Sequence, residues 1–80
     1  DYNDRNTVVA HLSLDHNERA MELLATMPKD AVTEYLRAIA CSRLGRKAEG
    51  REHFLEACRL DGRMEYRGNL DPEIAELLKQ

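Results

Sequence analysis

The 80-residue sequence has no tryptophan, one phenylalanine and three tyrosines, so aromatic side chains contribute little to a core. The core must instead consist mostly of Leu, Ala, Val, Ile and Met, a set that favours packed helices over a β-sandwich. A chain of this length forms one small domain and buries only about 60% of the surface that its unfolded state exposes. These features predict an all-α fold with a marginal core.

Several functional signals are also absent. No apolar run approaches the roughly 18 residues that suggest a transmembrane helix. The sequence contains no GxSxG nucleophile motif and no glycine-rich phosphate loop, so we expect neither an enzyme nor a cofactor. A net charge of −3 gives no general argument for nucleic-acid binding. The basic middle, residues 35–68, interleaves its charges with glutamates and lacks the aromatic residues that stack on bases.

The two cysteines show no metal-binding pattern. Cys41 and Cys58 are separated by 17 positions without a CxxC motif or a histidine at ligand spacing, which argues against zinc. If two antiparallel helices meet at Gly45, Cys41 lies near the turn and Cys58 near the far end, too far apart for a disulfide. Buried free thiols are therefore the prediction, and they favour a reducing compartment.

The three histidines give no metal site either. His11 and His16 are five positions apart, which does not place them on one helical face, and His53 lies in a different part of the chain. We expect all three to be solvated or capping residues. No metal ligand is therefore predicted from the sequence.

Hydrophobic spacing predicts helices over residues 7–14, 16–27, 31–44, 47–60 and 71–79. Residues 63–70 are expected to form a linker, either irregular throughout or with one helical turn over 64–67. Asp15 and Glu18 are spaced as a capping box before the second helix. Asp30 is the expected N-cap of the third helix, and Gly45 stands where a left-handed residue ends it. Asp71-Pro72 predicts the start of the last helix.

The predicted helix over 31–44 is apolar around most of its circumference, which predicts cover on more than one side. Its apolar residues are Val32, Tyr35, Leu36, Ala38, Ile39, Ala40, Cys41 and Leu44.

The second helices of the two predicted hairpins share a spacing. Ala20-x3-Leu24-x2-Met27 aligns with Gly50-x3-Phe54-x2-Ala57. This pattern resembles the tetratricopeptide repeat (TPR), a unit of about 34 residues with the pattern W-x2-L-G-x2-Y…A-x3-F…P. Over 31–62, the small positions are filled by Ala38 and Ala57, the turn by Gly45 and the aromatic position by Phe54. The departures are Glu34, Arg37 and Cys41 for Trp, Leu and Tyr, Gly50 for Ala, and Gly62 for the closing Pro.

The resemblance implies two TPR-like antiparallel hairpins, 6–27 and 31–62, stacked as a right-handed α–α superhelix within one domain over 1–80. The helix over 71–79 would cap them, as at the C-terminal end of bacterial TPR proteins, some of which are associated with the cell envelope. We accordingly expect a piece of a longer protein from the bacterial cytoplasm or cell envelope. A preceding repeat or a second copy of the chain is expected to cover Val8, Val9 and Leu12, so a homo-oligomer through the first hairpin is possible.

Members of the family bind a peptide or protein segment in a concave groove lined by the first helix of each hairpin. By position, the groove residues here would be Val32, Tyr35, Leu36, Ile39, Ser42 and Arg43. Lys and Asn, which clamp a terminal carboxylate in one variety, are replaced by Tyr35 and Ile39. The sequence therefore predicts a protein-binding scaffold, or alternatively a structural cap or dimerisation module without a ligand. A scaffold should expose Tyr35, Leu36 and Ile39, whereas a cap should bury them.

Overall fold

The computed structural model describes residues 4–79, in which each regular element is an α-helix. The predicted all-α class is therefore confirmed. The helices are α1 (Arg5–Ser13), α2 (Asn17–Leu24), α3 (Ala31–Arg43), α4 (Lys47–Leu60), α5 (Arg63–Asn69) and α6 (Pro72–Leu78).

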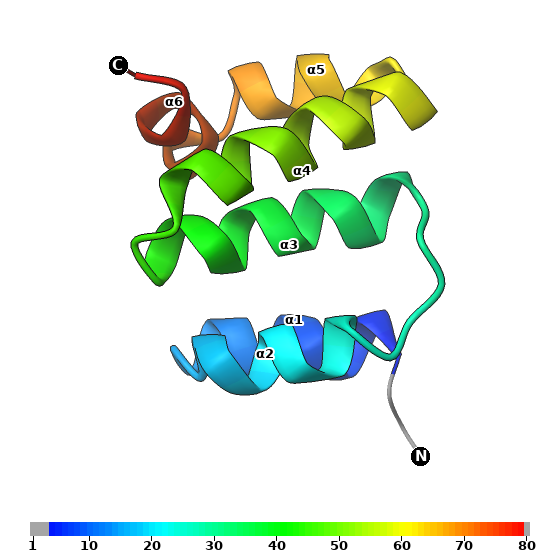
Figure 1. Cartoon of the computed structure of the whole chain (residues 1–80), viewed down its shortest axis with the longest axis vertical. Helices are drawn as coiled ribbons and strands as arrows, with labels where there is room; N and C mark the ends of the chain where they lie inside the picture. Colours follow the sequence, from blue (N-terminus) through cyan, green and yellow to red (C-terminus); the bar gives the residue numbers. More distant parts are fainter. Residues whose placement is uncertain (1–3, 80) are drawn as a thin grey trace.

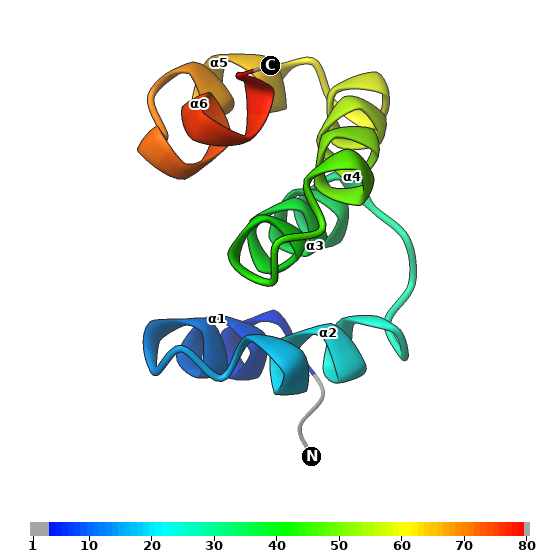
Figure 2. The same ribbon diagram turned by 60° about the vertical axis from the view of Figure 1, so that its left-hand side comes forward.

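Helix α3 is the centre of the molecule. Helices α1 and α2 form an antiparallel pair on one side of it, and α4 runs antiparallel to it (Figure 1). The two short helices α5 and α6 lie on the side away from α1 and α2 (Figure 2). Because α3 contacts each of the other five helices, the prediction that it is covered on more than one side is confirmed. Its buried residues are Thr33, Glu34, Tyr35, Leu36, Ala38, Ile39, Ala40 and Cys41.

The turns that join α1 to α2 and α3 to α4 have the same structure, 30 residues apart. The amide of His16 donates to the carbonyl of His11 at 2.8 Å, and the amide of Arg46 donates to that of Cys41 at 2.8 Å. This is the six-to-one hydrogen bond of a Schellman motif, which requires a left-handed residue just after the helix. Gly45, with φ of 80°, fills that position as predicted.

Asp15 occupies the equivalent left-handed position in the first turn, with φ of 61°. The prediction that Asp15 and Glu18 form a capping box is therefore wrong. His16 is the N-cap of α2, and its side chain makes no capping hydrogen bond. Aspartate tolerates the left-handed conformation better than most residues, so it can close the first helix where glycine closes the other.

The expected N-caps of α3 and α6 are confirmed. The Asp30 carboxylate accepts from the amide of Thr33 at 2.8 Å, and the Thr33 hydroxyl accepts from the amide of Asp30 at 2.9 Å. Asp71 accepts from the amide of Glu73 at 2.9 Å, with Pro72 as the first helical residue.

Several boundaries differ from the sequence prediction. Helix α1 begins at Arg5 rather than at residue 7, with Asp4 as its N-cap. Helix α2 ends at Leu24 rather than at Met27, because Pro28 disfavours a helical conformation at the residue before it. The linker expected over 63–70 is mostly helix α5, which extends well beyond the single helical turn expected over 64–67. A β-carbon at Gly68 would lie 2.5 Å from the ring of Phe54, so glycine allows α5 to approach α4 closely.

The first hairpin is already covered within the chain. Val8 and Leu12 are buried in the common core, whereas Val9 is 47% exposed. The expectation that another repeat or a second copy must cover Val8 and Leu12 is therefore wrong, because α1 packs against α2 and α3. Of the three residues expected to need cover, Val9 alone keeps an exposed side chain, and Leu14 at the end of the same helix is 66% exposed. None of the helices between residues 4 and 79 combines the length and apolar character needed to cross a membrane.

Replacing Asp30 with alanine should lower the free energy of unfolding by about 1 kcal/mol at neutral pH. The hydrogen bond from the Thr33 amide lowers the pKa of the Asp30 carboxyl below its ordinary value. The ionised cap therefore stabilises the fold above that ordinary value, and this contribution is lost as the pH falls through the lowered pKa. Urea denaturation should show the difference between wild type and Asp30→Ala shrinking below about pH 4.

The control is Asp30→Asn, which keeps a side-chain acceptor without the charge. It should retain most of the stability at neutral pH and lack the acid dependence. Equal losses in the two variants would contradict a capping role for the side-chain oxygen.

Candidate functional site

The predicted groove residues lie on α3, but most of them do not face solvent. Tyr35, Leu36 and Ile39 are each less than one-tenth exposed. Val32 and Ser42 are partly buried, and the Arg43 side chain is 27% exposed. The six residues thus lie on one helix, α3. The C-terminal helices α5 and α6 of the same chain pack against it.

The face of α3 from Tyr35 to Arg43 that the C-terminal segment covers is called the covered stripe. The Tyr35 ring lies at one end of it. Its hydroxyl donates to the Asp71 carboxylate at 2.8 Å, and the Arg67 guanidinium lies 4.6 Å from the ring centroid. The Phe54 ring packs against the Tyr35 ring in an edge-to-face arrangement, with the two centroids 6.1 Å apart. Burial, followed by the hydrogen bond to Asp71 and its charge, raises the pKa of the Tyr35 phenol well above its usual value.

Arg43 marks the other end of the stripe, two helical turns along from Tyr35. Its guanidinium donates two hydrogen bonds to the Glu73 carboxylate, at 2.7 and 2.9 Å. A third donor reaches the carbonyl of Leu12 at 2.6 Å, at the end of α1. One side chain therefore links α1, α3 and α6, and Ile39 lies between these two anchors on the same face.

The positions that depart from the TPR pattern form a polar network on another face of α3. Arg37 pairs with Glu34 and donates to the carbonyl of Leu24 at 2.5 Å, which caps the end of α2. Glu34 has a side chain only 3% exposed and accepts from Nδ1 of His53 at 2.7 Å. This network joins α2, α3 and α4 where the family pattern has apolar residues.

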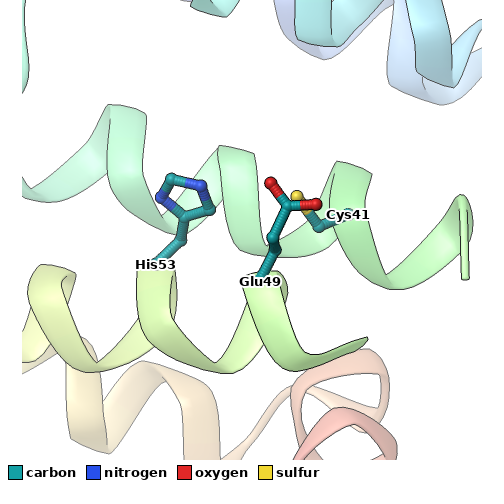
Figure 3. A group of neighbouring side chains, drawn as sticks. All are labelled: Cys41, Glu49 and His53. Carbon is teal, nitrogen blue, oxygen red and sulfur yellow. The ribbon is translucent and has the colours of Figure 1, made fainter. Parts of the chain in front are cut away.

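A second cluster extends this network along the seam between α3 and α4. Cys41, Glu49 and His53 each direct one potential metal-ligand atom to the same place, and these atoms all lie within 4.8 Å of one another (Figure 3). Cys41 is buried, Glu49 is exposed and His53 is between the two. Burial, with the Glu49 charge as the next cause, raises the pKa of the Cys41 thiol.

The sequence-based search for metal ligands missed this cluster because it compared linear spacings only. In an antiparallel hairpin, residues at equal distances before and after the turn face one another. Cys41 and Glu49 stand four positions before and four after Gly45, and His53 follows Glu49 by one helical turn. The predicted turn at Gly45 already contained the signal for this juxtaposition.

The other histidines are also closer together than their spacing suggested. The Nδ1 atoms of His11 and His16 lie 3.4 Å apart, because the turn between α1 and α2 folds His16 back over the end of α1. Their spacing along a single helix did not predict this contact, because His16 lies beyond the end of α1, at the N-cap of α2. The prediction of free cysteines is confirmed: Cys41 is buried and Cys58 partly buried, neither in a disulfide.

Comparisons with known proteins add no further identification: no family model, curated protein or solved structure matches this chain. Assignment to the TPR family therefore stays a prediction from the sequence pattern.

Replacing Tyr35 with phenylalanine should lower the free energy of unfolding by about 1 kcal/mol, the usual net value of one hydrogen bond. The raised pKa adds a pH dependence with a defined sign. The Tyr35 contribution is complete below the ordinary phenol value of about 10 and is lost as the pH rises toward the folded-state value. Denaturation at pH 7 and above pH 10 should show a smaller alkaline loss of stability in Tyr35→Phe than in wild type.

Tyr66→Phe is the matched control, because Tyr66 is largely exposed and should change stability by less than about 0.5 kcal/mol. An identical alkaline response in wild type and Tyr35→Phe would contradict the buried hydrogen bond.

Proposed function

We propose that this chain is a non-catalytic closing module of an array of TPR-like helix hairpins. Its role is to cover the groove face of the last hairpin with its own C-terminal segment, α5–α6. The observation that carries this proposal is the burial of Tyr35, Leu36 and Ile39, the three residues that a ligand-binding groove should expose. Of the two functions expected from the sequence, burial favours the structural cap.

The contacts between α5–α6 and the rest of the chain support a permanent cover rather than a segment that a ligand could displace. Tyr35 and Arg43 attach the segment at both ends of the stripe through Asp71 and Glu73. Between these ends, Leu77 lies close against Gly50 of α4, within 3.0 Å of the place of a β-carbon. A peptide entering the groove would have to displace all of these contacts.

The repeated turns support the array part of the proposal. The equivalent Schellman turns at Asp15 and Gly45 are 30 residues apart, the same offset that aligns Ala20 with Gly50 in the sequence. The chain would therefore present two hairpins of one type, with α1–α2 on the side opposite the cover. That side is the one on which a further hairpin would stack.

Gly68→Ala tests whether the cover protects the groove face. The new methyl group would overlap the Phe54 ring, and overpacking of this kind costs about 1–3 kcal/mol. This loss should exceed the gain of up to about 1 kcal/mol from replacing a helical glycine. We expect a lower free energy of unfolding, so that more chains expose α3, with more binding of a hydrophobic dye and concentration-dependent self-association in light scattering.

Gly62→Ala is the control, because a β-carbon there meets nothing within 4 Å. It should leave stability and oligomeric state unchanged. Self-association of both variants to the same extent would show that the effect does not come from uncovering α3.

The proposed function itself is tested by fusing the chain behind an idealised TPR array that lacks a cap. The fusion should melt at a higher temperature than the array alone and remain monomeric, because terminal repeats need a polar outer face. The same fusion carrying Gly68→Ala should lose most of this benefit. A fusion that aggregates and melts like the uncapped array would overturn the proposal.

A further inference from the structure

The cluster of Cys41, Glu49 and His53 has no part in covering α3. Packing between α3 and α4 would be served by apolar side chains, yet this part of the contact between the two helices holds a thiol, a carboxylate and an imidazole. Their ligand atoms lie within 4.8 Å of one another, and they come from both helices (Figure 3). A buried sulfur beneath two more exposed groups makes a site that is open at one side.

We propose that Cys41, Glu49 and His53 bind one Zn²⁺ ion across the α3–α4 hairpin. Sulfur, nitrogen and carboxylate oxygen are the three donor types that zinc takes from proteins. Three protein ligands leave a fourth tetrahedral position for solvent. On binding, the thiol of Cys41 gives its proton to solvent as the zinc–sulfur bond forms.

The geometry requires only a small closure of the side chains. Tetrahedral ligands at zinc–ligand distances of 2.0–2.3 Å lie roughly 3.4–3.6 Å from one another. Because all of the cluster's ligand atoms lie within 4.8 Å of one another, no pair needs to approach by more than about 1.4 Å. Glu49 and His53 can make this movement because they are exposed and part-exposed, whereas buried Cys41 supplies a fixed anchor.

His53 is already oriented for such a role. An ionised carboxylate can only accept hydrogen bonds. The 2.7 Å contact between Nδ1 of His53 and the Glu34 carboxylate therefore places the ring hydrogen of His53 on Nδ1. This leaves Nε2 for the metal, on the side of the ring that faces Glu49 and Cys41 in Figure 3. Metal-bound histidines commonly hold their second nitrogen on a carboxylate in this way. Arg37 holds Glu34 in turn, so the support exists before any ion arrives.

The local charges balance for a divalent cation. A Cys41 thiolate and the Glu49 carboxylate together neutralise its two positive charges. Two arginines near the Cys41 thiol, Arg37 and Arg46, carry positive charges that a bound cation would have to tolerate. Arg37 is paired with Glu34, and Arg46 is an exposed side chain that can turn away into solvent.

The test is a titration of the reduced, tag-free, full-length chain with Zn²⁺ against a chromophoric chelator. We expect one zinc ion per chain and a melting temperature that rises with zinc concentration. Co²⁺ should give the charge-transfer absorption of a cobalt–thiolate bond. The absence of saturable zinc binding and of the cobalt–thiolate band in wild type would overturn the proposal.

Glu49→Gln is the decisive variant because an exposed side chain can be changed without unfolding the chain. It should weaken zinc binding at least about tenfold, since even the loss of an outer-shell partner costs 10–100-fold. Glu52→Gln, at an exposed position of the same helix and outside the cluster, should bind zinc like wild type. Equal affinities in the two variants would contradict the site.

The cysteine is identified separately. Cys41→Ala should abolish the cobalt–thiolate band, whereas Cys58→Ala should retain it. The pair of His11 and His16 is the competing location for a metal, with Nδ1 atoms 3.4 Å apart. His16→Ala should leave zinc affinity unchanged, and a loss of binding in this variant alone would assign the ion to that pair and overturn the proposal.

Discussion

Helix α3 is buried on nearly every side, and the other five helices of the chain provide the cover. The first hairpin covers one side, α4 a second, and α5–α6 the third. The short helices could not exist without this contact, because a helix of seven residues is unstable alone in water. The burial of α3 and the formation of the C-terminal helices are therefore one event.

Polar groups fix how the three layers meet. Arg43 joins the end of α1 to α6, and Arg37 joins the end of α2 to α3. Buried Glu34 accepts hydrogen bonds from both Arg37 and His53, so its charge is paired and both of its oxygens have partners. Apolar residues of the family pattern would supply more burial at these positions, but they would not specify one register between the hairpins. We attribute the single arrangement of the layers to these charged contacts.

Most of the local structure could be predicted because it depends on neighbours in sequence. The caps at Asp30 and Asp71, the turn at Gly45 and the burial of α3 all follow from residue types at short spacing. Asp15 was misassigned because one residue type can either begin a helix or close the one before it. The choice depends on the turn as a whole.

The remaining features depend on tertiary contacts and could not be predicted from spacing alone. Helix α5 carries little apolar periodicity and forms where Gly68 lets it reach Phe54. The groove residues were placed on the correct helix, but nothing in their own spacing shows what covers them. The metal-ligand cluster differs from these: it can be found from the predicted turn at Gly45, but only by comparing positions across that turn, where Cys41 and Glu49 meet.

Native-state hydrogen exchange of the main-chain amides tests most directly whether α5–α6 and α3 form one cooperative unit. In low concentrations of denaturant, amides exchange with the free energy of the smallest unfolding that exposes them. We expect the hydrogen-bonded amides of α6, including that of Ala75, which donates to the carbonyl of Asp71 at 3.0 Å, to exchange with the same free energy as the amides of α3. Rapid exchange throughout α6 while α3 stays protected would contradict it, because the groove face would then be stable without its cover.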